Sequence, residues 1–335
     1  MDRALARSWL VSISNYSNQA LGQVECDCRR DVLYQPGLVF LRTAGDSRPY
    51  LALGESGGGG PKNRFSIRRR FGSVPGLSKQ EMSTEIFSLE GKTALVTGSS
   101  TGLGKRMAVA LGQAGAKVAM NYFNNEERAA QALSEFEATG AEGAMIRANV
   151  TEEADVNRLV AEAGEKLGPI DIVILNATPD QPQMPIEEYD WDFYQSMLDF
   201  FIKSPYLVTR AVLPHMKKQR WGRIINIGSE VFHLGVTPFT AYVSAKGGQN
   251  GFNRSLAHEL APWNITVNMI APGWIPVERH EKDPQELKDG YFASIPMQRW
   301  GVPEDLAGTI IYLASEASSF VTGQNIHVNG GTTVH

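Results

Sequence analysis

The stretch TGSSTGLG (97–104) follows the short apolar run TALVT (93–97) and opens an amphipathic segment. Its glycines, Gly98, Gly102 and Gly104, let the backbone approach a pyrophosphate, whose charge meets the first amides of the following helix. The spacing is G-x-x-x-G-x-G rather than G-x-G-x-x-G. By itself such a stretch can also be a plain tight turn between a strand and a helix. Its place directly after a strand favours a phosphate-binding loop.

The alternation of strand and helix continues from Glu90 to the end of the chain. Six further apolar runs have the character of buried parallel strands. They are KVAMN (117–121), GAMIRA (143–148), DIVIL (171–175), RIINI (223–227), ITVNMIA (265–271) and QNIHVNGG (324–331). Amphipathic stretches separate them, which predicts an α/β fold: one doubly wound Rossmann-type domain with a seven-stranded parallel sheet over residues 88–335.

Residues 1–87 differ from this pattern. They include the Gly-rich ESGGGGPKN (55–63) and the basic IRRRFGS (67–73), a composition typical of a flexible segment. We therefore expect a disordered N-terminal extension. A targeting peptide is the alternative, although Asp2 and the lack of an apolar core disfavour a secretory signal. Met82 is a natural start for the domain, which places residues 1–81 outside the working protein in our interpretation.

The overall composition excludes several classes of protein. A net charge of −4 gives no reason to expect a nucleic-acid partner, and no apolar run approaches the length of a membrane span. Only two cysteines occur, Cys26 and Cys28, and a lone C-x-C pair is a weak metal signal. We expect a cytoplasmic protein with no metal site and no thiol chemistry in the domain.

The second informative stretch is AYVSAKGG (241–248), in which Tyr242 and Lys246 lie four residues apart on one helix face. A phenol has an ordinary pKa of about 10, and a nearby ammonium favours the phenolate, so we expect Lys246 to lower the pKa of Tyr242. Ser229, at the end of a strand thirteen residues before the tyrosine, can donate to a substrate oxygen. Alone, the Tyr–Lys pair can equally be a surface tyrosine beside a solvated lysine.

These features occur together and in order, with NAT (176–178) and PG (272–273) between and after them. Over residues 88–335 the chain thereby resembles the short-chain dehydrogenase/reductase family. The resemblance implies hydride transfer between a nicotinamide and a carbonyl or alcohol carbon. Tyr242 would be the acid/base, Ser229 the oxygen-positioning donor and Lys246 the cation that tunes the tyrosine. The further cofactor contacts it implies are Ser100 and Leu103 at the phosphates, Asn149 and Val150 at the adenine, Asn176 and Ala177 at the ribose, and Pro272, Gly273 and Ile275 beside the nicotinamide, where Tyr242 and Lys246 also lie.

The end of the second strand bears on the choice of cofactor. An acid there hydrogen-bonds the ribose 2′-hydroxyl of NAD, but this chain has Asn121 and Tyr122, and no acid before Glu126. With no carboxylate to repel a 2′-phosphate, NADP(H) is favoured over NAD(H). No arginine stands at the expected place either. We expect both Asn121 and Tyr122 to contact the cofactor.

Three departures from the family pattern follow. Leu175 and Thr178 replace an amide and a glycine near the cofactor, and Val277 replaces a threonine. The Asn that elsewhere opens the long fourth helix, so that its main-chain carbonyl holds a water feeding the lysine, aligns with Phe201.

Pro205 offers a substitute for that Asn. It has no N–H, so the Phe201 carbonyl four residues earlier loses its helical partner. Our hypothesis is that Pro205 frees this carbonyl while the Phe201 ring only packs. The alternative is a kinked helix without catalytic meaning.

Residues 274–300 should cover the substrate, with Trp274, His280, Tyr291, Phe292 and Met297 as candidate lining residues. The general resemblance is to 3-oxoacyl-(acyl-carrier-protein) reductases and sugar dehydrogenases of the family. Arg220, in the basic KKQRWGR (217–223), matches one arginine that docks the acidic carrier, whereas Trp263 stands where a second is expected. The resemblance also implies a homodimer or homotetramer. The rival interpretation is a nucleotide-sensing or scaffolding protein that keeps the fold without catalysis.

Overall fold

The computed structural model describes residues 30–35, 38–43, 50–52 and 85–334. The chain divides into two compact units, residues 1–76 and 77–335. In the first unit, β1 (Arg30–Gln35), β2 (Leu38–Thr43) and β3 (Tyr50–Ala52) form an antiparallel sheet in that order. Apart from these strands and residues 85–87, the predicted N-terminal extension falls outside the described residues. The expectations for Cys26, Cys28 and Met82 fall outside the described residues.

The second unit contains the predicted seven-stranded sheet, with strand order β10-β9-β8-β7-β4-β5-β6 and every neighbouring pair parallel. The strands are β4 (Thr93–Val96), β5 (Lys117–Tyr122), β6 (Gly143–Arg147), β7 (Ile172–Leu175), β8 (Gly222–Ile227), β9 (Ile265–Pro272) and β10 (Asn325–Val328). The central strands β4, β7, β8 and β9 are buried along their whole length. That burial explains why their sequences are continuously apolar rather than alternating.

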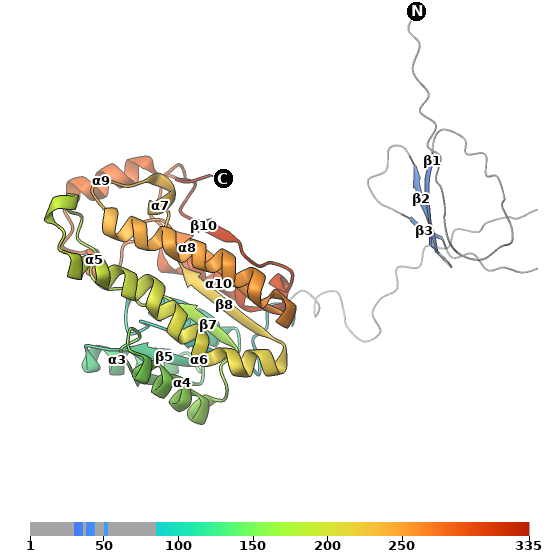
Figure 1. Cartoon of the computed structure of the whole chain (residues 1–335), viewed down its shortest axis with the longest axis horizontal. Coiled ribbons are helices and arrows are strands. Elements are labelled where there is room, and N and C mark those ends of the chain that lie inside the picture. Colours follow the sequence, from blue (N-terminus) through green and yellow to red (C-terminus); the bar gives the residue numbers. More distant parts are fainter. Residues whose placement is uncertain (1–29, 36–37, 44–49, 53–84, 335) are drawn as a thin grey trace, which may run out of the picture. The chain divides into compact units, whose positions relative to one another are not determined.

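Helices cover both faces of this sheet (Figure 1). The α-helices are α2 (Gly102–Gln113), α3 (Glu126–Glu137), α4 (Glu153–Leu167), α5 (Trp191–Leu198), α6 (Ser204–Gln219), α7 (Val231–Leu234), α8 (Thr240–Leu260), α9 (Gln285–Ser294) and α10 (Ala307–Ala314). The apolar sides of α2, α3 and α10 build one core with the sheet, and those of α4, α6 and α8 build the other. In the described part of the chain, no helix is long and apolar enough to cross a membrane.

The sheet changes direction between β4 and β7. The chain winds outward from β4 to β6 and then crosses back to place β7 on the other side of β4. In such sheets the carboxyl ends of the two central strands open a crevice where ligands bind. The loops that follow β4, β7, β8 and β9 all leave from this edge, and they carry the motifs that the sequence singled out.

The segment expected to be one proline-kinked helix is divided into three parts. Between α5 and α6 lies a π-helical turn, η2 (Asp199–Lys203), in which the Ser204 N–H donates to the Asp199 carbonyl five residues earlier. Pro205 is the second residue of α6. Because it has no N–H, Pro205 cannot serve the Phe201 carbonyl in an α-helical pattern, nor the Phe200 carbonyl in a π-helical one. The wide turn is thus an expected consequence of the proline.

Candidate active site

The predicted catalytic residues meet in one large pocket of about 980 Å³ at the carboxyl edge of the sheet. Ser229 follows β8, while Tyr242 and Lys246 come from the first turns of α8. Pro272 and Gly273, at the end of β9, close the same pocket. Within residues 85–334, no group of three or more His, Cys, Asp or Glu side chains is arranged to hold a metal ion.

Tyr242 is buried, with 8% of its surface exposed. Burial raises the pKa of its phenol above the ordinary value, while a hydrogen bond from Ser229 and the charge of Arg279 act in the opposite direction. The net direction is upward, so the expectation that Lys246 lowers this pKa is wrong for the protein alone. Desolvation of the phenolate outweighs the neighbouring donors.

Lys246 is held from three sides and is also buried. Its Nζ donates to the Ile227 carbonyl at 2.6 Å and to Gln249 Oε1 at 3.1 Å, and it lies 3.9 Å from the centre of the Phe201 ring. Burial, and secondarily the charge of Arg279, holds the pKa of Lys246 well below its usual range. The ammonium is therefore fixed by protein groups beside the tyrosine, with 5.6 Å between Nζ and the centre of the Tyr242 ring.

Phe201 contacts both catalytic side chains. Its ring meets that of Tyr242 edge-on, with 5.3 Å between the centroids, and presents its face to the Lys246 ammonium. A cation over an aromatic face is attracted to it. The interpretation that this ring only packs is therefore wrong, because the π-helical turn aims it at the lysine. The proposal that Pro205 frees the Phe201 carbonyl stays a prediction.

The phosphate loop is too narrow for side chains. A Cβ at Gly104 would lie 2.3 Å from the Gly98 carbonyl oxygen and 2.5 Å from Asn176 Nδ2, and one at Gly98 would lie 2.8 Å from Ala177 Cα. Asn176 Nδ2 donates to the carbonyls of Thr97 and Gly98 at 3.0 and 2.9 Å. Asn176 and Ala177 thus form the back of the loop, and the N-terminus of α2 faces its opening. This cradle fits the pyrophosphate of a dinucleotide.

Asn121 supports the loop from below. Its Oδ1 accepts the Gly98 N–H at 3.1 Å, and its Nδ2 donates to the carbonyls of Ile146 and Ala148 at 3.3 and 3.1 Å. The side chain is buried. These bonds do not fit the expected direct contact of its side chain with a cofactor. Tyr122, the last residue of β5, is only half-buried and remains a candidate contact.

The adenine side is prepared by the turn after β6. Asn149 donates its backbone N–H to Asp155 Oδ2 at 2.7 Å, and its side-chain oxygen accepts from the backbone and hydroxyl of Thr151. Only the oxygen of the Asn149 amide is used, which leaves the NH₂ group as a donor for a base. Val150 is buried beneath it. The adenine contact of both residues stays a prediction.

The nicotinamide side is lined by the residues expected there. Pro272, Gly273 and Ile275 border the pocket, and so does Leu103, which was expected at the phosphates. Ser100 is buried in the phosphate loop. Among the departures from the family, Thr178 borders the pocket and Leu175 is buried at the end of β7. Val277 packs 3.4 Å from the place of a Cβ on Gly102, so it fills space against the loop where a hydroxyl was expected.

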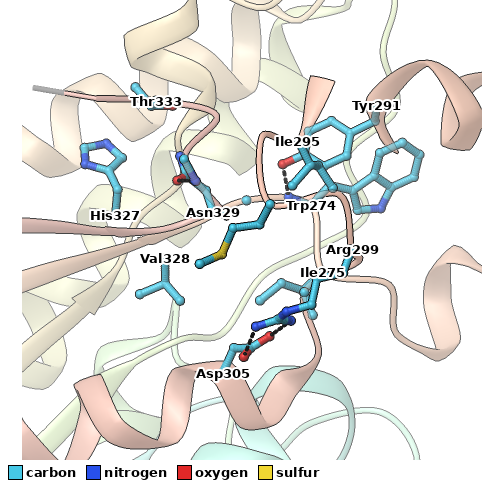
Figure 2. A pocket seen from close by; sticks show the side chains of 15 residues that line it. Trp274, Ile275, Tyr291, Ile295, Arg299, Asp305, His327, Val328, Asn329 and Thr333 are labelled. Atoms are coloured by element: carbon cyan, nitrogen blue, oxygen red, sulfur yellow. Dashed lines mark hydrogen bonds and ion pairs between the residues drawn. The ribbon is translucent and has the colours of Figure 1, made fainter. Parts of the chain in front are cut away.

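The segment 274–300 forms the outer wall of the pocket, which we call the lid. Trp274, His280 and Tyr291 border the pocket as expected, whereas Phe292 does not. Met297 borders a second cavity of about 420 Å³, behind the ring pair of Trp274 and Tyr291 (Figure 2). These two rings lie 5.5 Å apart and separate the two cavities. Figure 2 also shows the Trp274 backbone N–H donating to the Tyr291 hydroxyl, at 2.7 Å.

Glu230 ties the lid to the sheet. It follows Ser229, is 3% exposed, and accepts hydrogen bonds from the Tyr291 hydroxyl, Asn329 Nδ2 and the Thr333 hydroxyl. Burial and this carboxylate raise the pKa of Tyr291. A buried carboxylate whose side-chain donors are all neutral is uncommon. Through its three hydrogen bonds, Glu230 connects the lid and the Ser229 loop with the last described residues of the chain.

Three functional candidates escaped the sequence analysis: Gln249, Glu230 and Arg279. Gln249 lies three residues after Lys246, so helical spacing alone could have placed it on the same face. Glu230 had only its adjacency to Ser229 as a signal. Arg279 is one charge among many in the lid sequence, and nothing in that sequence distinguishes it.

Comparison with known proteins agrees with this geometry. The family model described as enoyl-(acyl carrier protein) reductase matches residues 98–333. The chain is 37% identical to a 3-oxoacyl-(acyl-carrier-protein) reductase of Staphylococcus epidermidis over 242 residues, which are 72% of this chain and 98% of the relative. It is 36% identical to a 2-dehydro-3-deoxy-D-gluconate 5-dehydrogenase of Formosa agariphila over 253 residues, 75% and 96% of the two chains.

Among solved structures, a gluconate 5-dehydrogenase from Burkholderia cenocepacia in complex with NADP and tartrate superposes with a TM-score of 0.70 at 32% identity, covering 75% of this chain and 98% of that one. The fold of the second unit agrees with these relatives. The chain is an NAD(P)-dependent oxidoreductase that belongs to the short-chain dehydrogenase/reductase family.

Proposed function

We propose that this protein is an NADP(H)-dependent oxidoreductase that interconverts a carbonyl and a secondary alcohol, with Tyr242 as acid/base. The observation that carries the proposal is the convergence of Ser229 with the buried Tyr242 and Lys246, from the end of β8 and from α8, in one pocket beside the glycine cradle. The residues around the cradle suit a dinucleotide, as Gly104 and Asn149 show.

The chain's own residues divide the work of the reaction. When bound, the nicotinamide gives or takes the hydride. In the reductive direction Tyr242 donates its phenolic proton to the carbonyl oxygen, and Ser229 donates a hydrogen bond to the same oxygen. Because burial raises the pKa of Tyr242, the phenol is protonated at neutral pH, ready to act as the acid. Lys246, anchored by Ile227 and Gln249, places its positive charge beside the phenolate that remains.

A preference for NADP(H) has two supports. No carboxylate stands at the end of β5, and Asn121 faces inward. In addition, β6 aligns Arg147 with Tyr122, and Arg147 Nε donates to the Phe123 carbonyl at 3.1 Å. This exposed guanidinium lies beside the strand end where a 2′-phosphate is read, although the sequence shows no arginine at the usual place. The solved relative from Burkholderia cenocepacia holds NADP.

The two classes of relatives suggest different substrates. Docking of an acyl carrier protein would use Arg220, but its Nη2 donates to the Pro262 carbonyl at 2.7 Å and its guanidinium lies 5.7 Å from the Trp263 ring. Arg220 is therefore already engaged, and Trp263 supplies no second cation. This favours a small free substrate of the sugar-acid kind over a carrier-bound 3-oxoacyl chain.

The family resemblance also supports a homodimer or homotetramer, in which α5–α6 and α8 would pair across a two-fold axis. Tyr206 on α6 is exposed and available for such a contact. Sedimentation equilibrium of the purified protein tests this, and a monomer at micromolar concentration would contradict it.

The experiment that tests the function follows NADPH and NADH oxidation over a panel of keto acids, keto sugars, acyl thioesters, quinones and aldehydes. We expect turnover with NADPH on at least one class, and a loss of turnover in Tyr242→Phe with NADPH binding retained. NADPH binding without turnover on any class would instead favour the nucleotide sensor.

A further inference from the structure

Arg279 stands in the wall of the catalytic pocket opposite the reacting groups. It belongs to the short turn η4 (Glu278–His280) in the lid, and it lines the same pocket as Ser229, Tyr242 and Lys246. Its side chain is exposed to the solvent in the pocket mouth. The lid thus places a guanidinium where a substrate must pass or rest.

This guanidinium has no acidic partner. Five other arginines of the second unit pair with carboxylates, among them Arg158 with Asp155 and Arg299 with Asp305. Across residues 85–334, no carboxylate lies at ion-pair distance from Arg279, and its polar neighbour is His280, with 3.0 Å between Nε and His280 Nε2. Burial lowers the pKa of His280 to about 4, so the imidazole is neutral at pH 7.

The charge of Arg279 also reaches the reaction centre. It lowers the pKa of both Tyr242 and Lys246, which means that its field extends across the pocket to the phenol and the ammonium. One substrate molecule in this pocket could therefore reach Arg279 with an anionic group and reach Ser229 and Tyr242 with its carbonyl.

We propose that Arg279 binds the carboxylate of the substrate, so that the enzyme interconverts a hydroxy acid and the corresponding keto acid. This inference rests on the proposed function and adds the residue that recognises the acid group of the substrate. A guanidinium presents two parallel N–H donors that match the two oxygens of a carboxylate.

The other residues of the pocket wall favour a substrate with a single carboxylate and several hydroxyl groups. Asp283 and Glu286 border the same pocket, so a second negative charge on the ligand would be repelled. Their oxygens, with the Gln183 amide, accept or share hydrogen bonds with hydroxyl groups. A phosphate dianion suits this wall less well than a carboxylate does.

The reaction balances within the proposed function. In the oxidative direction, the carbinol C–H bond breaks and its hydride, with two electrons, reduces NADP⁺ to NADPH. The hydroxyl proton goes to the Tyr242 phenolate, and the carbon–oxygen single bond becomes a carbonyl. The carboxylate held by Arg279 is unchanged throughout.

The test compares acids with neutral partners of equal length, in both wild type and variants. NADP⁺ reduction is measured with gluconate against glucitol, and with threonate against threitol, in a buffer free of other carboxylates. For Arg279→Gln we expect kcat/KM on the acids to fall about 100-fold, mainly through KM, with a far smaller change on the polyols, confined to the shift of their pH profile. Arg279→Lys should recover part of the loss. Lys282→Gln removes an exposed lid cation that does not border the pocket, and should change neither substrate class.

Equal losses on acids and polyols in Arg279→Gln would overturn the inference, as would a wild-type enzyme that prefers the polyols. Inorganic phosphate that inhibits more strongly than acetate would overturn the monocarboxylate assignment. Calorimetry of gluconate binding to the protein–NADPH complex separates this inference from the proposed function. Arg279-dependent binding without turnover of any substrate supports the carboxylate site while the proposed function fails. Turnover of neutral carbonyl compounds without a preference for acids would support the proposed function and contradict the carboxylate site.

Discussion

The two walls of the catalytic pocket are built in different ways. The inner wall lies at the ends of β4, β7, β8 and β9, and its polar side chains bond to neighbouring backbone, as that of Asn176 does. The lid wall is an aromatic surface around Trp274 and Tyr291, with exposed charges such as Arg279.

This difference separates the residues proposed for the reaction, in the inner wall, from those proposed to select the substrate, in the lid. Under the proposed function the cofactor and the reacting oxygen bind at the inner wall, so changes there should disturb contacts that every substrate needs. Changes in the lid alter single side chains that face the variable part of the substrate. Inner-wall variants should therefore lose turnover on all substrates, and lid variants should change which substrate is preferred.

The largest effect is expected for Tyr242→Phe. Loss of the acid/base should lower kcat by about 10³-fold, within the usual range for general acid–base catalysis. Fluorescence titration with NADPH should show unchanged cofactor affinity. Tyr312→Phe, on α10 and away from the pocket, is the matched control. A Tyr242→Phe enzyme with more than a tenth of wild-type kcat would remove the tyrosine from the mechanism.

A second test contrasts two glycines of the phosphate loop. Gly104→Ala forces a Cβ to within 2.3 Å of the Gly98 oxygen and should abolish measurable NADPH binding. Gly102→Ala meets only Val277 at 3.4 Å, and the positive φ of 54° costs about 1 kcal/mol, so its loss of affinity should be several-fold. Titration of both variants with NADPH gives the comparison. Equal affinities would show that the cradle is not where the cofactor binds.

Gln249 should position Lys246. In Gln249→Leu the ammonium loses an acceptor at 3.1 Å, and we expect kcat to fall about 10-fold at constant KM. Gln249→Glu restores an acceptor and should recover most of the rate, an outcome that a purely structural role of the amide does not predict. A Glu variant as slow as the Leu variant would count against this role.

Pro205→Ala tests the π-helical turn. Restoring an N–H at position 205 gives the Phe201 carbonyl a partner again and should lower kcat by about three- to ten-fold, since water-mediated proton steps lose only part of their efficiency. NADPH affinity should remain the same. Unchanged turnover would leave the proline with a structural role alone. Pro214→Ala, in the same helix but beyond the pocket, is the control.

The smallest effect is a shift of a pH profile. The guanidinium of Arg279 lowers the pKa of Tyr242, so Arg279→Gln should raise it. Reduction requires the protonated phenol and fails as pH rises through this pKa, so its alkaline limb should move to higher pH. Oxidation requires the phenolate, and its rising limb should move the same way. A neutral substrate pair isolates this effect from carboxylate binding, and a shift to lower pH would contradict it.

Much of the inner wall was predictable from the sequence. Buried parallel strands have apolar runs, and a turn that only glycine fits constrains its residues, so the strands and the β4 loop followed from local patterns. Ser229, Tyr242 and Lys246 followed only from the family resemblance that the motifs carry together. What the sequence could not show was the direction in which a side chain points. The inward turn of Asn121 depends on carbonyls of β6 and beyond, more than twenty residues away.

The lid and the π-helical turn were harder for a related reason. The Phe201 ring faces Lys246 because Pro205 widens the helix before it, a geometric consequence that a pattern of residue types does not show. Arg279 stands out only because its acidic neighbours in sequence, such as Glu278 and Glu281, are not its ion-pair partners in space. The lack of an ion-pair partner among the described residues can be seen in the structure but not in the sequence.

Glu230 stabilises the position of the lid through the hydrogen bond that it accepts from Tyr291. Without the Tyr291 hydroxyl, this buried carboxylate would keep only Asn329 and Thr333 as donors among the described side chains. Leaving a buried acceptor short of one partner costs about 1–3 kcal/mol. Any movement that separates Tyr291 from Glu230 is therefore opposed by this bond, in a network that Asn329 and Thr333 share.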